Sequence, residues 1–195
     1  MPSMEREDWN AFVDTIKENV RSHAGYFTWL SDRDIEEGGV VQSLHESLAH
    51  SNEAFFHSYQ SRGRGNDPPD CEAHTFAGGR IGIEVTELVD GASIAAVKAG
   101  AAGRWEPFSE RQLFDLLAQR IAKKDQPNDV KGGPYDQYLL IIYCDEPRAL
   151  DVGLIEYARR AVFPRAELID RAFLLFSYSP WEGYCPYIEL TLNDD

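Results

Sequence analysis

One stretch, residues 66–88, constrains the fold of this chain more than any other. In its second half, apolar residues alternate with glycine and polar residues over positions 81–86, which indicates a strand with one apolar face and one polar face. Pro68-Pro69 cannot join a central ladder, so a preceding strand is expected to begin at about Asp70. Between the two runs, Gly78-Gly79 is a hairpin signal. The stretch therefore predicts a β-hairpin.

The predicted hairpin carries two carboxylates that converge on one face of a sheet. Asp70 stands at the start of the first strand, and Glu84 lies in the middle of the second. Gly82 leaves room beside Glu84 on the same face. Because Mg²⁺ takes oxygen ligands and keeps several of its waters, two converging carboxylates suit a hard divalent cation. We therefore predict a site for Mg²⁺ or Mn²⁺ at Asp70 and Glu84.

The sequence Pro69-Asp70, a spacer and then Glu84-Val85-Thr86 resembles the motif of the PD-(D/E)XK nuclease superfamily, which has the restriction-endonuclease-like fold. The resemblance covers about residues 43–144, where the predicted elements follow in the family's order. It implies a metal-dependent nuclease that hydrolyses phosphodiester bonds of nucleic acid. Asp70 and Glu84 would then be the metal ligands, and the Val85 carbonyl would be a further, backbone ligand.

The chain departs from the family motif at Thr86, which stands where the motif has lysine. Family members that lack this lysine can supply it from a neighbouring helix, and Thr86 itself could only form a hydrogen bond. Lys124 and Lys123, at the end of a helix predicted over residues 109–124, are the candidates for this catalytic role. The alternative is that they satisfy the last carbonyls and the dipole of that helix.

In the resembling fold, the helix before the Pro-Asp strand often donates a third acidic residue to the metal. Here that helix is predicted from about residue 40 or 44 to 60, and it contains Glu46 and Glu53. Ser43 and Glu46 have the spacing of a capping box, which gives Glu46 a structural explanation. Glu53 is therefore the predicted additional metal ligand, unless both side chains are simply solvated.

Hydrophobic periodicity predicts the remaining elements. Helices are expected at residues 5–22 and 151–162, strands at 138–144, 172–178 and 187–192 (the last at a sheet edge), a linker at 31–39, and a short helix with a lid-like loop in the Ala- and Gly-rich segment 90–104. The result is an α/β fold with a mixed sheet of about five strands flanked by helices, a restriction-endonuclease-like αβ sandwich. An N-terminal helical extension (1–39) would precede the α/β domain (40–195), with which it forms one unit.

The net charge restricts the function classes. Residues 1–70 carry 6 basic and 13 acidic side chains and residues 71–195 carry 13 and 20, so the net charge of −14 is spread evenly. Such acidity argues against a free-standing DNA binder, because phosphate contacts supply most nucleic-acid affinity. A nucleic acid substrate would require a locally basic groove, to which Arg62 and Arg64 could contribute, or a protein partner that delivers it. The alternative function is a catalytically inactive nuclease-like domain that acts as a protein-interaction or regulatory module.

Other residue patterns exclude further classes. Three widely spaced cysteines argue against a disulfide framework or a structural zinc site and fit a reducing cytoplasm. The chain has no apolar run near the ~20 residues of a membrane span, and its acidic N-terminus lacks the apolar core of a signal peptide, so we expect a cytoplasmic protein without membrane contact. A histidine metallohydrolase is a distant alternative, because ligand spacing is missing among His45, His50, His57 and His74.

Overall fold

A computed structural model of the chain describes residues 33–88, 108–145 and 151–193. Its centre is a seven-stranded mixed sheet in the order β1-β2-β3-β4-β6-β7-β5. The strands are β1 (Phe56–Ser61), β2 (Cys71–Thr75), β3 (Arg80–Glu87), β4 (Gln137–Cys144), β5 (Val162–Phe163), β6 (Arg171–Phe176) and β7 (Tyr187–Leu192). The described helices are α2 (Arg33–His50), α4 (Glu110–Lys124) and α5 (Val152–Arg160), with a 3₁₀ turn η1 (Pro127–Asp129) after α4. The α/β class and the mixed sheet are confirmed, with two strands more than predicted.

The predicted hairpin is present as β2 and β3. The two strands pair antiparallel from Cys71 opposite Ile83 to His74 opposite Arg80. At the turn, Gly78 has a φ of +91°, a conformation that favours glycine. Strand β3 then pairs in parallel with β4, and β4 in parallel with β6, so the hairpin leads directly into the buried centre of the sheet.

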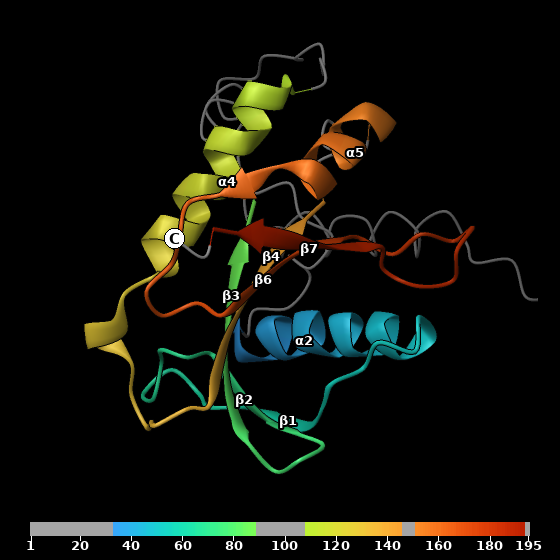
Figure 1. Ribbon diagram of the computed structural model, residues 1–195. Coiled ribbons are helices and arrows are strands. Elements are labelled where there is room, and N and C mark those ends of the chain that lie inside the picture. The colour runs from blue at the N-terminus through green and yellow to red at the C-terminus, as the bar shows by residue number, and fades with distance from the viewer. Residues whose placement is uncertain (1–32, 89–107, 146–150, 194–195) are drawn as a thin grey trace, which may run out of the picture.

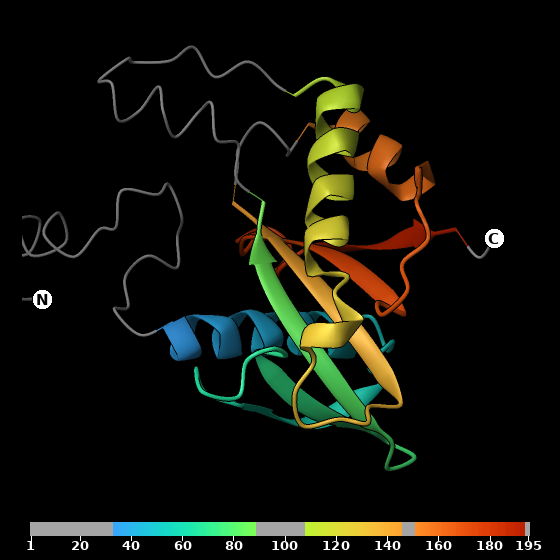
Figure 2. The ribbon, with the colours of Figure 1, turned by 90° about the vertical axis from the view of Figure 1, so that its left-hand side faces the viewer.

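Helices cover both faces of the sheet (Figures 1 and 2). Helix α2 packs on one face, where its apolar residues join those of β3 that point the same way, namely Ile81, Ile83 and Val85. Helices α4 and α5 pack on the other face, over a separate core that includes Leu117, Leu140 and Leu174. The sequence pattern predicts that Gly82, Glu84 and Thr86 lie on the face opposite Ile81, Ile83 and Val85. Because side chains alternate along a strand, this is the face that α4 covers.

The expected linker at residues 31–39 is wrong from Arg33 onward, because α2 begins there and runs through the expected domain boundary at residues 39 and 40. Two adjacent glycines suggested a linker, and each costs a helix about 1 kcal/mol relative to alanine. Burial of Val40, Val41 and Leu44 against the sheet offsets this cost. The expected capping box is also wrong, since Ser43 lies within the helix and its hydroxyl donates to the Gly39 carbonyl at 2.9 Å.

Helix α2 ends at His50 rather than at residue 60. Asn52 has a φ of +58°, and the N–H groups of Asn52 and Glu53 donate to the carbonyls of Ala49 and Leu48 at 3.1 and 2.8 Å. This is a Schellman motif, in which asparagine takes the left-handed position that glycine more often occupies. The chain then enters β1, which pairs antiparallel with β2 and adds an unpredicted strand to the sheet.

The expected edge strand at residues 187–192 is not the last strand of the sheet. The two-residue strand β5 pairs in parallel with the end of β7, so β1 and β5 are the edges of the described sheet. The predicted helix at residues 5–22 and the Ala- and Gly-rich segment at 90–104 lie outside the described residues. All three cysteines are buried free thiols. None of the three described helices is long and apolar enough to cross a membrane.

Candidate metal centre

Strand β3 is longer than its partner β2, and its last residues, from Glu84 on, have no β2 residue opposite them. The side chain of Asp70, which precedes β2, lies beside this unpaired part of β3. Pairing between the two strands ends at Cys71 and Ile83. The Asp70 carboxylate, 3 % exposed, accepts a hydrogen bond at Oδ2 from the Val85 N–H at 2.8 Å. Because the N–H and C=O of one strand residue point to the same side, the Val85 carbonyl also faces Asp70 rather than β4. The structure therefore brings together three predicted groups: Asp70, the backbone of Val85 and the neighbouring Glu84.

Glu84 is a buried carboxylate with one partner on each oxygen. It is 4 % exposed and points from β3 towards the C-terminal end of α4. Its Oε1 forms an ion pair with the Lys124 ammonium group, and its Oε2 accepts a hydrogen bond from the Tyr138 hydroxyl at 3.3 Å. Lys124 follows the buried line Leu113–Leu117–Ile121 of α4 by one further turn, and this position brings its ammonium group to Glu84.

Asp67 completes a group of three carboxylates. One oxygen each of Asp67, Asp70 and Glu84 lies within 4.8 Å of the others. Sequence reasoning missed Asp67, because in an extended segment it would lie about 10 Å from Asp70. The signal that could have identified it is its place in the same short polar stretch before the proline pair.

Helix α2 brings further acidic residues to the same end of the sheet. Glu37 is 9 % exposed and lies on the first turns of α2, in the segment expected to be a linker. A small hollow next to Asp70 is lined by Asp34, Glu37, Gly63, Arg64, Asp67 and Asp70. Helix α2 therefore places Glu37 near Asp70, whereas the predicted metal ligand Glu53 and its alternative Glu46 do not lie in this group.

This arrangement makes ionisation of Asp70 unfavourable. Burial, followed by the nearby Glu84 and Glu37 carboxylates, raises the pKa of Asp70 to about 8. The Val85 N–H and the Lys124 ammonium group act in the opposite direction but do not compensate. A further positive charge at this point would relieve the repulsion between Asp70 and the neighbouring carboxylates.

Other predicted site residues lie elsewhere. Glu53 follows the end of α2 and is exposed, and its carboxylate accepts a hydrogen bond from the Tyr187 hydroxyl on β7. Glu46 is exposed on α2 and accepts a hydrogen bond from Gln42 at 2.7 Å. Lys123 points to solvent, so Lys124 alone of the two lysines reaches the centre. Thr86 lies partly buried on the Glu84 face.

The three carboxylates fit a hard divalent cation. Oxygens on opposite sides of Mg²⁺ are roughly 4.2 Å apart, and those around Ca²⁺ are roughly 5 Å apart. The 4.8 Å limit on the distances among Asp67, Asp70 and Glu84 therefore lies within the range of such ions. The spacing by itself does not select Mg²⁺ over a larger ion. The raised pKa of Asp70 is consistent with such a site, because a bound cation would offset both the burial of the carboxylate and its repulsion by Glu84, which raise that pKa.

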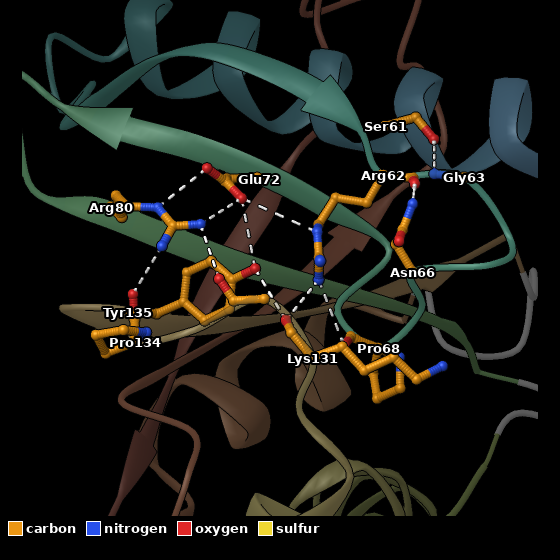
Figure 3. A network of polar contacts seen from close by, with 11 residues as sticks. Ser61, Arg62, Gly63, Asn66, Pro68, Glu72, Arg80, Lys131, Pro134 and Tyr135 are labelled. Carbon is orange, nitrogen blue, oxygen red and sulfur yellow. Dashed lines mark hydrogen bonds and ion pairs between the residues drawn. The ribbon is translucent and has the colours of Figure 1, made fainter.

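A polar network beside the centre holds the loop that carries Asp67 (Figure 3). Glu72 on β2 accepts two hydrogen bonds from the Arg80 guanidinium, at 3.1 and 2.8 Å, and forms a 3.9 Å ion pair with Arg62. The Arg62 guanidinium in turn donates to the Lys131 carbonyl at 2.7 Å. Lys131 donates from its ammonium group to the Asp67 carbonyl. The network therefore connects the strands of the hairpin to the backbone of Asp67.

We expect Glu72→Gln to destabilise the protein by about 2 kcal/mol, because it leaves two partly buried guanidinium groups without their anion. Hydrogen bonds from Arg80 hold the pKa of Glu72 below the usual value of a glutamate, so this contribution to stability is present at neutral pH and is lost as acidification protonates Glu72. Urea unfolding at pH 7 measures the change.

The matched control for this prediction is Glu189→Gln. Glu189 forms an equally bidentate pair with Arg171, at 2.6 and 2.8 Å, but its side chain is 47 % exposed. Because exposed ion pairs contribute roughly 0–1 kcal/mol, the control should change little. Equal destabilisation by both substitutions would contradict the special role of Glu72.

Comparisons with known proteins give no further guide to this centre. The chain has no significant match among protein-family profiles, among curated proteins or among solved structures.

Proposed function

We propose that the protein is a metal-dependent nuclease that hydrolyses phosphodiester bonds of nucleic acid. The observation that carries the proposal is the contact of Lys124 with Glu84, next to Asp70 and Asp67. Two strand carboxylates with a lysine at the same point are the groups that the PD-(D/E)XK resemblance implies. Here the lysine comes from a helix 40 residues further along the chain.

The order of elements around the centre supports a restriction-endonuclease-like core. Helix α2, the β2–β3 hairpin, helix α4 and the parallel strand β4 come in the order that the resemblance implies, with strand β1 between α2 and β2. Glu84 lies on β3 and Asp70 directly precedes β2, while the helices before and after the hairpin contribute Glu37 and Lys124. The remaining strands, β6, β7 and β5, extend the sheet on the far side of β4.

Each residue has a distinct part in the proposed reaction. Asp67, Asp70 and Glu84 would hold the cation, with the Val85 carbonyl as a further oxygen ligand. A bound Mg²⁺ or Mn²⁺ lowers the pKa of water and polarises the scissile phosphate. Lys124 carries a positive charge at the edge of the carboxylates, where it would orient the attacking water or stabilise the charge that develops on the phosphate.

The experiment that tests the proposal is cleavage of mixed DNA and RNA substrates with Mg²⁺ or Mn²⁺, by the wild type and by Asp70→Ala and Glu84→Ala. We expect cutting that depends on the metal and is lost in both variants. Cutting that survives in both would place the activity outside this centre. No cutting, with no Mn²⁺ binding in calorimetry, would overturn the proposal.

The affinity for Mn²⁺ is expected to rise as the pH is raised from 6 to 8. The pKa of Asp70 is about 8, so below that pH the carboxylates hold a proton that a cation must displace. Displacement of one proton makes the apparent Kd fall about tenfold for each pH unit. Calorimetric titrations in buffers of different ionisation enthalpy measure both Kd and proton release. A Kd that is constant over this range would contradict the assignment of Asp70 as a ligand.

The charge near the centre favours a second candidate function. The hollow beside Asp70 has four carboxylate side chains and one guanidinium, that of Arg64, in its lining, and the whole chain has a net charge of −14. Carboxylates repel the phosphates of a nucleic acid. An inactive nuclease-like domain that serves as a protein-interaction or regulatory module would be free of this conflict. Failure to bind Mn²⁺ in the experiment above would favour the module.

A further inference from the structure

The two oxygens of Glu84 are held by groups from different elements. Lys124, from α4, contacts Oε1, while the Tyr138 hydroxyl, from β4, donates to Oε2 at 3.3 Å. The last torsion of a glutamate side chain is broad, so its carboxylate has no preferred orientation of its own. Contacts with neighbouring groups must therefore orient the carboxylate of Glu84. Of the two partners, Tyr138 is 3 % exposed and is the one fixed within the sheet.

The position of Tyr138 depends on Gly82. The two residues are direct neighbours across β3 and β4. A Cβ atom at position 82 would lie 2.8 and 2.9 Å from two carbons of the Tyr138 ring and 3.2 Å from Cγ of Pro69. The ring thus fills the space that the glycine leaves beside Glu84. Any larger residue at position 82 would displace the ring or the proline.

Contacts with Asp170 and Tyr135 also fix the position of Tyr138. Its N–H donates to the Asp170 carboxylate at 2.6 Å, which fixes the start of β4. Its ring meets the edge of the Tyr135 ring, with centroids 6.2 Å apart at an angle of 71°. The tyrosine is therefore a rigid donor, in contrast to the long and flexible side chain of Lys124.

We propose that Tyr138 is a positioning residue for the metal centre. Its hydroxyl holds Oε2 of Glu84 and so keeps Oε1 directed towards Lys124 and the cation. This inference rests on the proposed function, because it assigns Glu84 to a bound cation. Groups that orient metal ligands in this way typically change metal affinity or activity by 10–100-fold when they are removed.

The test compares Tyr138→Phe with the wild type in calorimetric titrations with Mn²⁺. The substitution keeps the ring that fills the space above Gly82 and removes only the hydroxyl. We expect the Kd for Mn²⁺ to rise about tenfold. The matched control is Tyr143→Phe, which removes a hydroxyl from a buried tyrosine on the same strand whose ring belongs to the core under α2. The control should bind Mn²⁺ like the wild type.

A second variant tests the part of Gly82. Gly82→Ala should weaken Mn²⁺ binding as Tyr138→Phe does, because the added methyl group displaces the Tyr138 ring or Pro69, the residue before Asp70. Equal affinity of Tyr138→Phe and the wild type would overturn the inference alone and leave the nuclease proposal standing. An equal loss in Tyr143→Phe would overturn it as well, since the effect would then come from general packing. Absence of Mn²⁺ binding by the wild type would overturn both proposals.

Discussion

Replacing Asp70 with asparagine is expected to weaken Mn²⁺ binding by roughly 100-fold or more and, at the same time, to stabilise the metal-free protein. Affinity falls because a charged ligand is lost from a group of three. Stability rises because burial and the nearby Glu84 and Glu37 carboxylates make an ionised Asp70 unfavourable in the folded protein, as the raised pKa of Asp70 reflects. Asparagine keeps an oxygen for the Val85 N–H and carries no charge.

The stabilisation should depend on pH in a defined direction. The pKa of Asp70 is higher in the folded state, about 8, than in the unfolded state, 3.8. The wild-type protein therefore loses stability as the pH rises through this range. The difference in melting temperature between Asp70→Asn and the wild type should therefore grow over this range. We expect a gain of about 2 kcal/mol, or roughly 5 °C, at pH 8. Calorimetric melting in the presence of a chelator measures it.

The matched control is Asp136→Asn. The Asp136 carboxylate also accepts a hydrogen bond from a backbone N–H of β3, that of Arg80 at 2.7 Å, but it is exposed. Its neutralisation should leave the Mn²⁺ affinity unchanged, because Asp136 lies outside the group of Asp67, Asp70 and Glu84. A lower melting temperature for Asp70→Asn at pH 8 would show that the ionised carboxylate stabilises the metal-free fold, contrary to this account.

Replacing Lys124 with methionine is expected to reduce the cleavage rate at least about 100-fold while Mn²⁺ binding is retained. Lys124 forms an ion pair with Oε1 of Glu84, and its removal frees this oxygen, so the metal affinity should stay unchanged or rise. The metal-free variant should be about 2 kcal/mol less stable, because Glu84 then has no cation partner in a buried position. Added Mn²⁺ should raise the melting temperature of the variant more than that of the wild type.

Lys123→Met provides the control for this result, since it removes the same charge from the preceding residue, which points to solvent. Single-turnover cleavage with Mn²⁺ in excess separates the chemical step from binding. Full activity in Lys124→Met would show that the lysine has only a structural role, as the ion-pair partner of Glu84. Equal loss in both variants would indicate a general effect of positive charge on substrate binding.

These two substitutions separate metal binding from catalysis. Asp70→Asn removes binding and improves stability, whereas Lys124→Met removes catalysis and impairs stability. Residues selected for stability alone would not show the first pattern, because a buried group of carboxylates around Asp70 costs free energy in the absence of a cation. A result of this kind would therefore argue for a functional centre without reference to any related protein.

Several features could be predicted from the sequence because they depend on residues close together in the chain. The hairpin follows from alternation over residues 81–86 and from the glycine pair before it. Helix α4 begins at the predicted capping box, in which Ser109 and Gln112 satisfy each other's backbone N–H groups. Lys124 could be named because it continues the buried line of that helix at regular helical spacing.

Other features were decided only by tertiary structure. Helix α2 includes two glycines because the sheet offers its apolar residues a place to be buried, and no local pattern reports that burial. Asp67 and Glu37 join the centre because the loop before β2 and the first turns of α2 meet at the same end of the sheet. The contact of Tyr138 with Glu84 joins residues 54 positions apart.

The sequence by itself therefore determined the two strand carboxylates, the helix that carries the lysine, and the α/β class. Only the tertiary structure decided which carboxylates accompany Asp70 and Glu84, and which side chain fills the space at Gly82. The physical reason is the range of the interactions. Periodicity, caps and turns act over a few residues, whereas burial, repulsion between carboxylates and cross-strand packing act between segments that only folding brings together.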